Sequence, residues 1–141
     1  MASADLLWHC VKKNSSFIRK SVNMPVMTAE PGNLTGLNSF RFSGLANKKV
    51  VGLDAKLSGK KESIILTTKS KKTSRSYRPR GILLETGIKK GPKKGLAQLK
   101  KVMEAGFYRQ DLMSLALTKY TKIKQSFKKR KLVVKSCRAG K

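Results

Sequence analysis

The spacing of hydrophobic residues changes along the chain, from short apolar runs in the first half to a helical period after residue 93. Two runs, 49–55 and 63–69, are rich in Val, Leu, Ile and Thr, which suit strands. The connection 56–62 contains a Ser-Gly turn signal. The two runs therefore predict an antiparallel β-hairpin with a loop longer than two residues.

Beyond residue 93 the apolar residues recur at i, i+3 and i+7, as they do on one face of an amphipathic helix. The pattern predicts a helix over 94–105, with Gly106 at the position of a C-terminal capping glycine. A second helix is predicted over 111–127, with Asp111 as a possible N-cap. The short linker between them indicates an antiparallel helix pair.

The N-terminal third predicts shorter elements. Residues 3–11 suit a helix with Ser3 as N-cap and Trp8 as a core anchor among apolar neighbours. Residues 17–20 and 24–28 are candidate short strands, and the Ala-Glu-Pro-Gly-Asn sequence that follows is a strong turn signal.

Segment 38–45 alternates aromatic and polar residues, which favours a strand. In that strand Phe40 and Phe42 would lie on one side, facing the core or, as the alternative, RNA, and Arg41 would lie on the opposite side. Residues 69–80 carry six cations and no aliphatic residue, so their composition predicts a basic loop.

Together these elements predict one small α+β domain. It would hold an N-terminal helix, short antiparallel strands including the β-hairpin, a C-terminal helix pair and basic extensions. We expect the domain to span residues 1–127 and a basic C-terminal tail to span 128–141. The pattern leaves open the type of segment 81–88, which contains a short apolar run.

Charge narrows the function. The 141 residues include 33 Lys+Arg and 7 Asp+Glu, for a formal net charge of +26. Residues 1–68 hold 10 cations and 4 acids, and residues 69–141 hold 23 and 3, so 20 of the 26 net charges lie in the second half. Solubility needs a net charge of only about 2–8. The surplus indicates contact with a polyanion, and the long irregular basic segments favour a large folded RNA.

Catalysis and metal binding find little support. The seven acids are scattered, His9 is the single histidine, and Cys10 and Cys137 lie far apart in the sequence. No zinc-site, nucleophile–base or P-loop spacing occurs, and no apolar run approaches the roughly 18 residues of a membrane span. We therefore expect no enzymatic activity, cofactor, metal, membrane contact or small-molecule substrate. We also expect both cysteines to be reduced thiols.

Phosphate contacts require Lys or Arg. We expect them from segment 41–49, from the 69–80 loop, from the predicted second helix and the linker before it, and from the tail. The candidate RNA-binding residues are Arg41, Lys48, Lys49, Lys71, Lys72, Arg75, Arg78, Arg80, Arg109, Lys122, Lys128, Lys129, Arg130 and Lys131. On a 3.6-residue helical wheel continued past residue 127, Lys122 and Lys129 lie two turns apart on one side, a stripe that suits a groove flanked by phosphates.

Several short motifs carry a resemblance to a known family. They are Leu6-Leu7-Trp8, Asn14-Ser15-Ser16-Phe17, the segments 30–34 and 38–45, and Tyr108-Arg109-Gln110-Asp111-Leu112. In order, spacing and total length the chain resembles the L28e family of eukaryotic large-subunit ribosomal proteins. The resemblance implies a non-catalytic structural component that binds the major ribosomal RNA of the large subunit and supports translation. It also implies neighbouring ribosomal proteins as partners, and a cytoplasmic ribosome reached by nuclear or nucleolar transit.

Two other functions stay open. A nuclear ribosome-assembly factor would share the RNA-binding module but would usually add an acidic or coiled-coil region, which this sequence lacks. A chromatin-type nucleic-acid-binding protein of the linker-histone kind would have a tail rich in Lys, Ala and Pro. Residues 128–141 contain one Ala and no Pro.

Overall fold

The structure, a computed structural model, describes residues 2–59 and 61–127, apart from the side chains of residues 73, 79 and 80. The predicted basic tail, 128–141, lies outside the described residues. Within this part of the chain the fold is a small α+β domain, as the sequence predicted.

A three-stranded antiparallel sheet forms the centre of the molecule. Its strands are β3 (Val51–Ser58), β4 (Lys61–Lys69) and β5 (Leu83–Ile88), in the order β3-β4-β5. The predicted hairpin is confirmed as β3–β4, but its predicted loop of more than two residues is wrong. The strands run further toward the tip than expected, and Ser58 pairs with Lys61, so only two residues connect them. The sequence left the secondary structure of segment 81–88 undecided, and this segment contains the third strand, β5. Its Ile88 lies opposite Ile64, so the apolar residues of β5 continue the row begun by β4.

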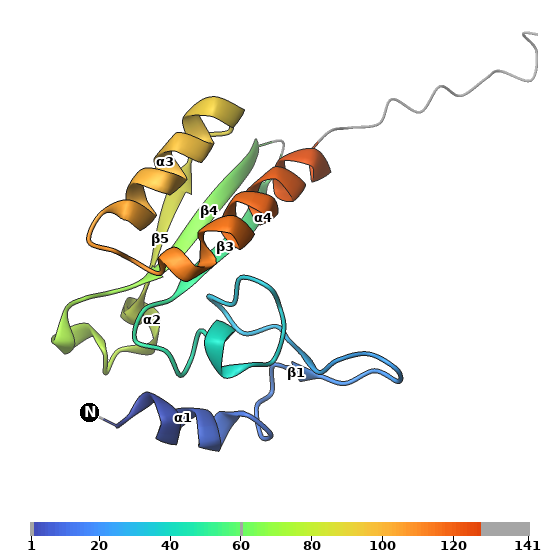
Figure 1. Cartoon of the computed structure of the whole chain (residues 1–141), viewed down its shortest axis with the longest axis vertical. Coiled ribbons are helices and arrows are strands. Elements are labelled where there is room, and N and C mark those ends of the chain that lie inside the picture. The colour runs from blue at the N-terminus through green and yellow to red at the C-terminus, as the bar shows by residue number, and fades with distance from the viewer. Residues whose placement is uncertain (1, 60, 128–141) are drawn as a thin grey trace, which may run out of the picture.

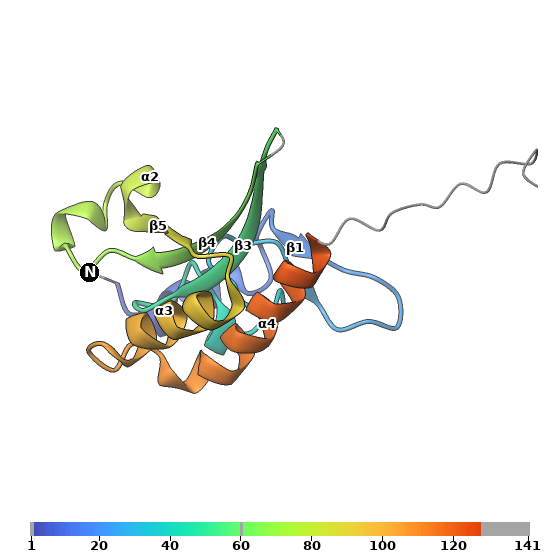
Figure 2. The ribbon, with the colours of Figure 1, turned by 90° about the horizontal axis from the view of Figure 1, so that it is seen from above.

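Two helices, α3 (Pro92–Glu104) and α4 (Met113–Ser126), cover one face of this sheet (Figures 1 and 2). The predicted helix pair is therefore confirmed. Strand residues that alternate toward the helices are buried together with the helix residues that face them. The core consists of Leu34, Val51, Leu53, Ile64, Leu66, Ile88, Leu99, Met103, Tyr108, Leu112, Ala116 and Tyr120.

At Gly95, α3 lies close to α4 and to the turn that precedes α3. It is buried, and a Cβ atom at this position would overlap the Tyr120 hydroxyl and the Lys89 carbonyl oxygen. The same hydroxyl donates to the Lys89 carbonyl at 2.6 Å. The glycine therefore lets α4 and the turn before α3 meet across the first turn of the helix.

The end of α3 follows the sequence prediction. Gly106 adopts a φ of 71°, and the Tyr108 amide donates to the Met103 carbonyl at 2.9 Å. This bond closes the helix by using one of its last free carbonyls. The start of α4 differs from the prediction, because Asp111 lies inside a 3-10 turn, η3 (Gln110–Leu112), and no side chain caps α4.

The N-terminal helix α1 (Ala4–Val11) begins at Ser3, whose hydroxyl accepts the Leu6 amide at 3.2 Å. This confirms the predicted cap. No residue of α1 is buried, so the prediction of Trp8 as a core anchor is wrong. Trp8 is half-buried, and its ring centroid lies 6.0 Å from that of Phe40. The α1 helix lies away from α3 and α4, below the sheet as seen in Figure 1.

The strands predicted at 17–20 and 24–28 are present but shorter than expected. They are β1 (Ile18–Arg19) and β2 (Met27–Thr28), two residues each, and they pair antiparallel. The loop between them extends away from the domain (Figure 1). Its Val22 is 88% exposed, so this segment lacks the apolar burial that would extend the ladder.

The predicted strand at 38–45 is wrong. Residues Phe40–Phe42 form a 3-10 turn, η1. The Ser43 amide donates to the Ser39 carbonyl at 3.0 Å, and the Asn47 side chain donates to the Phe40 carbonyl at 2.6 Å, so local bonds replace a ladder. As a result Phe42 packs against the core, whereas Phe40 contacts Trp8.

The basic loop is confirmed in part. Residues 70–72 and 76–78 are irregular, but η2 (Thr73–Arg75) and the four-residue helix α2 (Pro79–Ile82) lie within or next to it. The Ser70 amide donates to the Ile82 carbonyl at 2.8 Å, which joins the two ends of the segment where β4 ends and β5 begins.

Candidate nucleic-acid interface

Tyr108 joins three separate segments at the end of the sheet where β3 begins and β4 ends. Its hydroxyl donates to the Val50 carbonyl at 2.9 Å and accepts the amides of Val50 at 3.1 Å and Lys69 at 3.3 Å. The side chain is buried. The linker between α3 and α4 is thereby fixed to the sheet, and the residues on either side of it are fixed with it.

Arg109 is a second anchor at this end. Its backbone adopts φ and ψ of 50° each, and the side chain is 15% exposed. The guanidinium donates to the Arg41 carbonyl at 2.8 Å, to the Lys49 carbonyl at 3.2 Å and to Asp111 at 3.0 Å. Asp111 also accepts from the Arg41 guanidinium at 3.4 Å. This cluster ties η1 and the approach to β3 to the start of η3.

Lys69 forms hydrogen bonds to the backbone of segment 45–47. Its ammonium donates to the Asn47 carbonyl at 2.8 Å and to the Leu45 carbonyl at 3.4 Å. Burial lowers the pKa of Lys69 below its ordinary value, because the charged form has lost part of its hydration. The amine therefore holds segment 45–47 against the sheet.

These anchors place six exposed cations around one end of the sheet, which we call the basic end: Lys48, Lys49, Lys71, Lys72, Arg75 and Arg78. Among the residues that the structure describes, ion pairs join Arg41 and Arg109 to Asp111, Lys56 to Glu85 and Lys119 to Asp54. None of these pairs includes a residue of the basic end. Within the described part of the chain, no carboxylate therefore forms an ion pair with these exposed cations.

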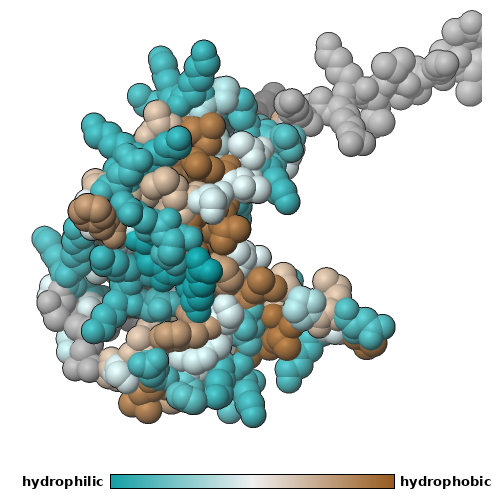
Figure 3. All heavy atoms as spheres, in the orientation of Figure 1, coloured by the Kyte–Doolittle hydropathy of each residue, from teal (hydrophilic) through white to brown (hydrophobic). Residues whose placement is uncertain are grey.

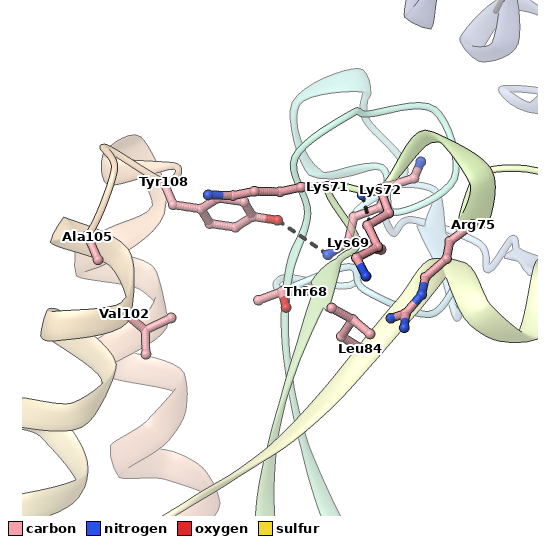
Figure 4. Close-up of a pocket in the computed structure, with 10 residues that line it drawn as sticks. Thr68, Lys69, Lys71, Lys72, Arg75, Leu84, Val102, Ala105 and Tyr108 are labelled. Carbon is pink, nitrogen blue, oxygen red and sulfur yellow. Dashed lines mark hydrogen bonds between the residues drawn. The ribbon is translucent and has the colours of Figure 1, made fainter.

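A groove of about 410 Å³ opens between the basic end and the last turn of α3 (Figure 4). Lys71, Lys72 and Arg75 line it on one side, and Val102 and Ala105 on the other. Leu84 and the Tyr108 ring complete its apolar part. The groove thus combines hydrophobic walls with cations.

The other predicted residues are placed differently. Arg41 is exposed but shares Asp111, and Arg109 is committed to contacts within the protein. Lys122 lies on α4 beside a separate cavity of about 520 Å³, whose lining includes Glu30 and Asp54. Figure 3 shows the surface hollowed between α4 and the β1–β2 segment. The side chain of Arg80 is not described, and Lys128, Lys129, Arg130 and Lys131 lie outside the described residues.

Two residues that organise the basic end were absent from the sequence prediction, Tyr108 and Lys69. Tyr108 stands two residues after the capping Gly106, and an aromatic residue in so short a linker is a signal for an anchor. Nothing in the sequence distinguishes Lys69 from the neighbouring lysines, because its role depends on carbonyl groups that the fold brings to it.

Residues 2–59 and 61–127 hold neither a metal-binding cluster nor a membrane-spanning helix. No group of three or more His, Cys, Asp or Glu side chains lies close enough there to hold a metal ion. No helix in the same part of the chain has the length and hydropathy needed to cross a membrane. Cys10 is exposed as a free thiol, and Cys137 lies outside the described residues.

Comparison with known proteins gives consistent results. The large ribosomal subunit protein eL28 of Dictyostelium discoideum is 42% identical over 53 residues, which are 38% of this chain and 39% of that protein. The protein of the same name from Schizosaccharomyces pombe is 36% identical over 70 residues, 48% of this chain and 50% of that protein. The Caenorhabditis elegans protein of that name is 30% identical over 103 residues, 72% of this chain and 74% of that protein.

The matches to the first two relatives thus span half or less of their length, and the match to the third about three quarters. The model of the ribosomal L28e protein family matches residues 6–126, which include all the described elements except the first residues of α1. The resemblance seen in the short motifs is therefore confirmed over most of the sequence, and the chain belongs to the ribosomal L28e protein family.

Proposed function

We propose that this chain is a structural constituent of the large ribosomal subunit that binds and stabilises ribosomal RNA through the basic end. Its site of action would be the cytoplasmic ribosome, after assembly in the nucleolus, with neighbouring ribosomal proteins as further partners. The relatives in this family are named as large ribosomal subunit proteins.

The observation that supports the proposal is the set of six exposed cations that converge from two segments on one end of the sheet and that form no ion pair with the described residues. Segment 48–49 precedes β3, and segment 71–78 follows β4, so the register of the hairpin brings them together. When these cations contact a polyanion, counterions condensed on the polyanion are released into solution, and this release favours binding. The rigid anchors beneath them, Tyr108 and Arg109, keep the cations in one arrangement.

The test uses the full chain and RNA extracted from large subunits. We compare the wild type with Lys71→Glu/Lys72→Glu and with a control, Lys100→Glu/Lys101→Glu, whose residues are exposed on α3. Both variants lower the formal net charge by the same amount, from +26 to +22. Each lost phosphate contact reduces the slope of log affinity against log salt by about 1. We expect a slope change of about 2 for the first variant and a smaller change for the control.

The same variants, tagged and expressed in eukaryotic cells, are then followed through sucrose gradients. The wild type and the control should sediment with large subunits and polysomes, and the basic-end variant should be depleted from both. Equal RNA affinity and equal incorporation of the two variants would exclude the basic end as the interface. A chain found with nuclear precursors but not with polysomes would indicate an assembly factor instead.

A further inference from the structure

We propose that the groove beside the basic end receives one unstacked nucleobase of the bound RNA, with its apolar walls on the base and its cations on the adjoining phosphates. The proposal rests on the RNA-binding function proposed above and specifies what this part of the surface recognises.

The groove exists because α3 covers β5 unevenly. In the middle of α3, the Gln98 side chain donates to the Gly87 carbonyl at 3.3 Å and accepts the Lys89 amide at 3.1 Å, which fixes the helix to the end of the strand. Ile88 at that end is 7% exposed. Leu84, on the same face of β5 but at its beginning, is 36% exposed. The strand face is therefore sealed at one end and open at the other.

The open end presents apolar surface that the protein itself leaves uncovered. Val102, which faces the groove from the last turns of α3, is 38% exposed, and Ala105 beside it is also exposed. The Tyr108 ring also lines the groove and lies between Ala105 and Lys69 in Figure 4. A volume of about 410 Å³ lies within the roughly 300–1,000 Å³ that small-ligand sites occupy. Flat heterocycles suit such walls, because every base has an apolar face whatever its edge carries.

The charges around the groove select the class of ligand. Lys71, Lys72 and Arg75 line it, and Lys49 places its ammonium 5.9 Å from the centre of the Tyr108 ring. Among the described residues that line the groove there is no carboxylate. In Figure 4 the Arg75 guanidinium lies toward Leu84, so a cation and an apolar residue border the same opening. An apolar face with phosphates on one side is the chemistry of a single nucleotide in an unpaired stretch of RNA.

The first test measures whether binding depends on bases. The full chain is titrated, at about 0.2 M salt to weaken backbone contacts, with a ten-nucleotide single-stranded RNA and with an abasic strand of the same length and charge. We expect the base-containing strand to bind about tenfold more tightly. Ala105→Leu, which narrows the groove at unchanged net charge, should reduce this preference. Ala97→Leu, the same change at an exposed position elsewhere on α3, should retain it.

The second test locates the base. In methyl NMR spectra of the full chain, the signals of Leu84 and Val102 should shift with the base-containing strand and stay in place with the abasic one. Equal affinity for the two strands, or methyl signals that respond to neither, would overturn the base site while leaving the phosphate contacts of the basic end intact. Failure of both strands to bind would instead count against the proposed function. Methyl shifts caused by an acidic polyglutamate peptide but not by RNA would reassign the groove to a protein segment.

Discussion

Replacing Gly95 by alanine tests how closely α3, α4 and the turn before α3 are packed. In an exposed helix interior this change stabilises by about 1 kcal/mol, because alanine restricts the unfolded chain and favours the helix. Here the added methyl would overlap the Tyr120 hydroxyl and the Lys89 carbonyl oxygen. Overpacking of this kind costs about 1–3 kcal/mol.

Moving Tyr120 would also weaken its hydrogen bond to Lys89, worth about 0.5–1.5 kcal/mol. The unfavourable contributions then total about 1.5–4.5 kcal/mol, and subtraction of the helix preference leaves a net destabilisation of about 0.5–3.5 kcal/mol. The measurement is urea denaturation of the full chain followed by circular dichroism, with the free energy of unfolding extrapolated to water.

A double-mutant cycle with Tyr120→Phe identifies the cause. Removing the hydroxyl gives part of the space back, so Gly95→Ala should cost less in the Tyr120→Phe background than in the wild type, and the two changes should be non-additive. A Gly95→Ala variant that is more stable than the wild type would refute the packing argument. Additive effects would mean that the Lys89 carbonyl alone causes the strain.

Three further predictions concern side chains described above. Burial raises the pKa of Tyr120 above its ordinary value of 10.0, so the folded state keeps a proton that the unfolded state loses. The resulting stabilisation is complete below pH 10.0 and is lost as the pH rises through the folded pKa, and Tyr120→Phe should show a smaller decline in urea midpoint over that range. Phe40→Ala should lower stability by about 1.5–2.5 kcal/mol, half the cost of a fully buried ring, and should shift the fluorescence of Trp8 to longer wavelength; an unchanged spectrum would contradict their contact. Tyr108→Phe should cost about 1–3 kcal/mol and speed exchange of the Val50 amide, whereas normal protection of that amide would show that the hydroxyl is not its acceptor.

Periodicity predicted the elements whose burial repeats along the chain. The helices α3 and α4 each bury one regular face, so their hydrophobic residues recur at helical spacing. The hairpin β3–β4 was predictable from two runs rich in Val, Leu, Ile and Thr on either side of a turn signal. The caps at Ser3 and Gly106 were predictable for a different reason, because a hydroxyl acceptor or a positive φ depends on one residue and its immediate neighbours.

The errors arise where hydrogen bonds, ion pairs or packing that the residue pattern does not show override that pattern. The alternation around Phe40 and Phe42 is real, but Asn47 takes the Phe40 carbonyl, and the segment turns instead of extending. Aspartate is a favoured N-cap residue, but the carboxylate of Asp111 pairs with Arg41 and Arg109 and does not cap α4. Trp8 has apolar neighbours in sequence, but α1 packs outside the core.

The sequence located cationic segments but could not locate the surface that they form. The six cations of the basic end meet because the hairpin register places 48–49 beside 71–78. Lys122 also lies in a lysine-rich segment of the sequence, but in the structure it lies beside a cavity lined partly by the carboxylates of Glu30 and Asp54. The assignments of individual RNA-binding residues stay predictions, which the charge-reversal variants will test.

The placement of α3 and α4 over a single face of the sheet also has a consequence for synthesis of the chain. The strand residues Leu53, Ile64 and Leu66 are buried by helices that are made after them, between residues 92 and 126. At about 5–20 residues per second, the roughly 40 residues after β5 take about 2–8 s to be added. Until both helices have docked, these strand residues lack the side chains that cover them, and a chaperone that binds hydrophobic segments would find its target then and lose it once α4 docks.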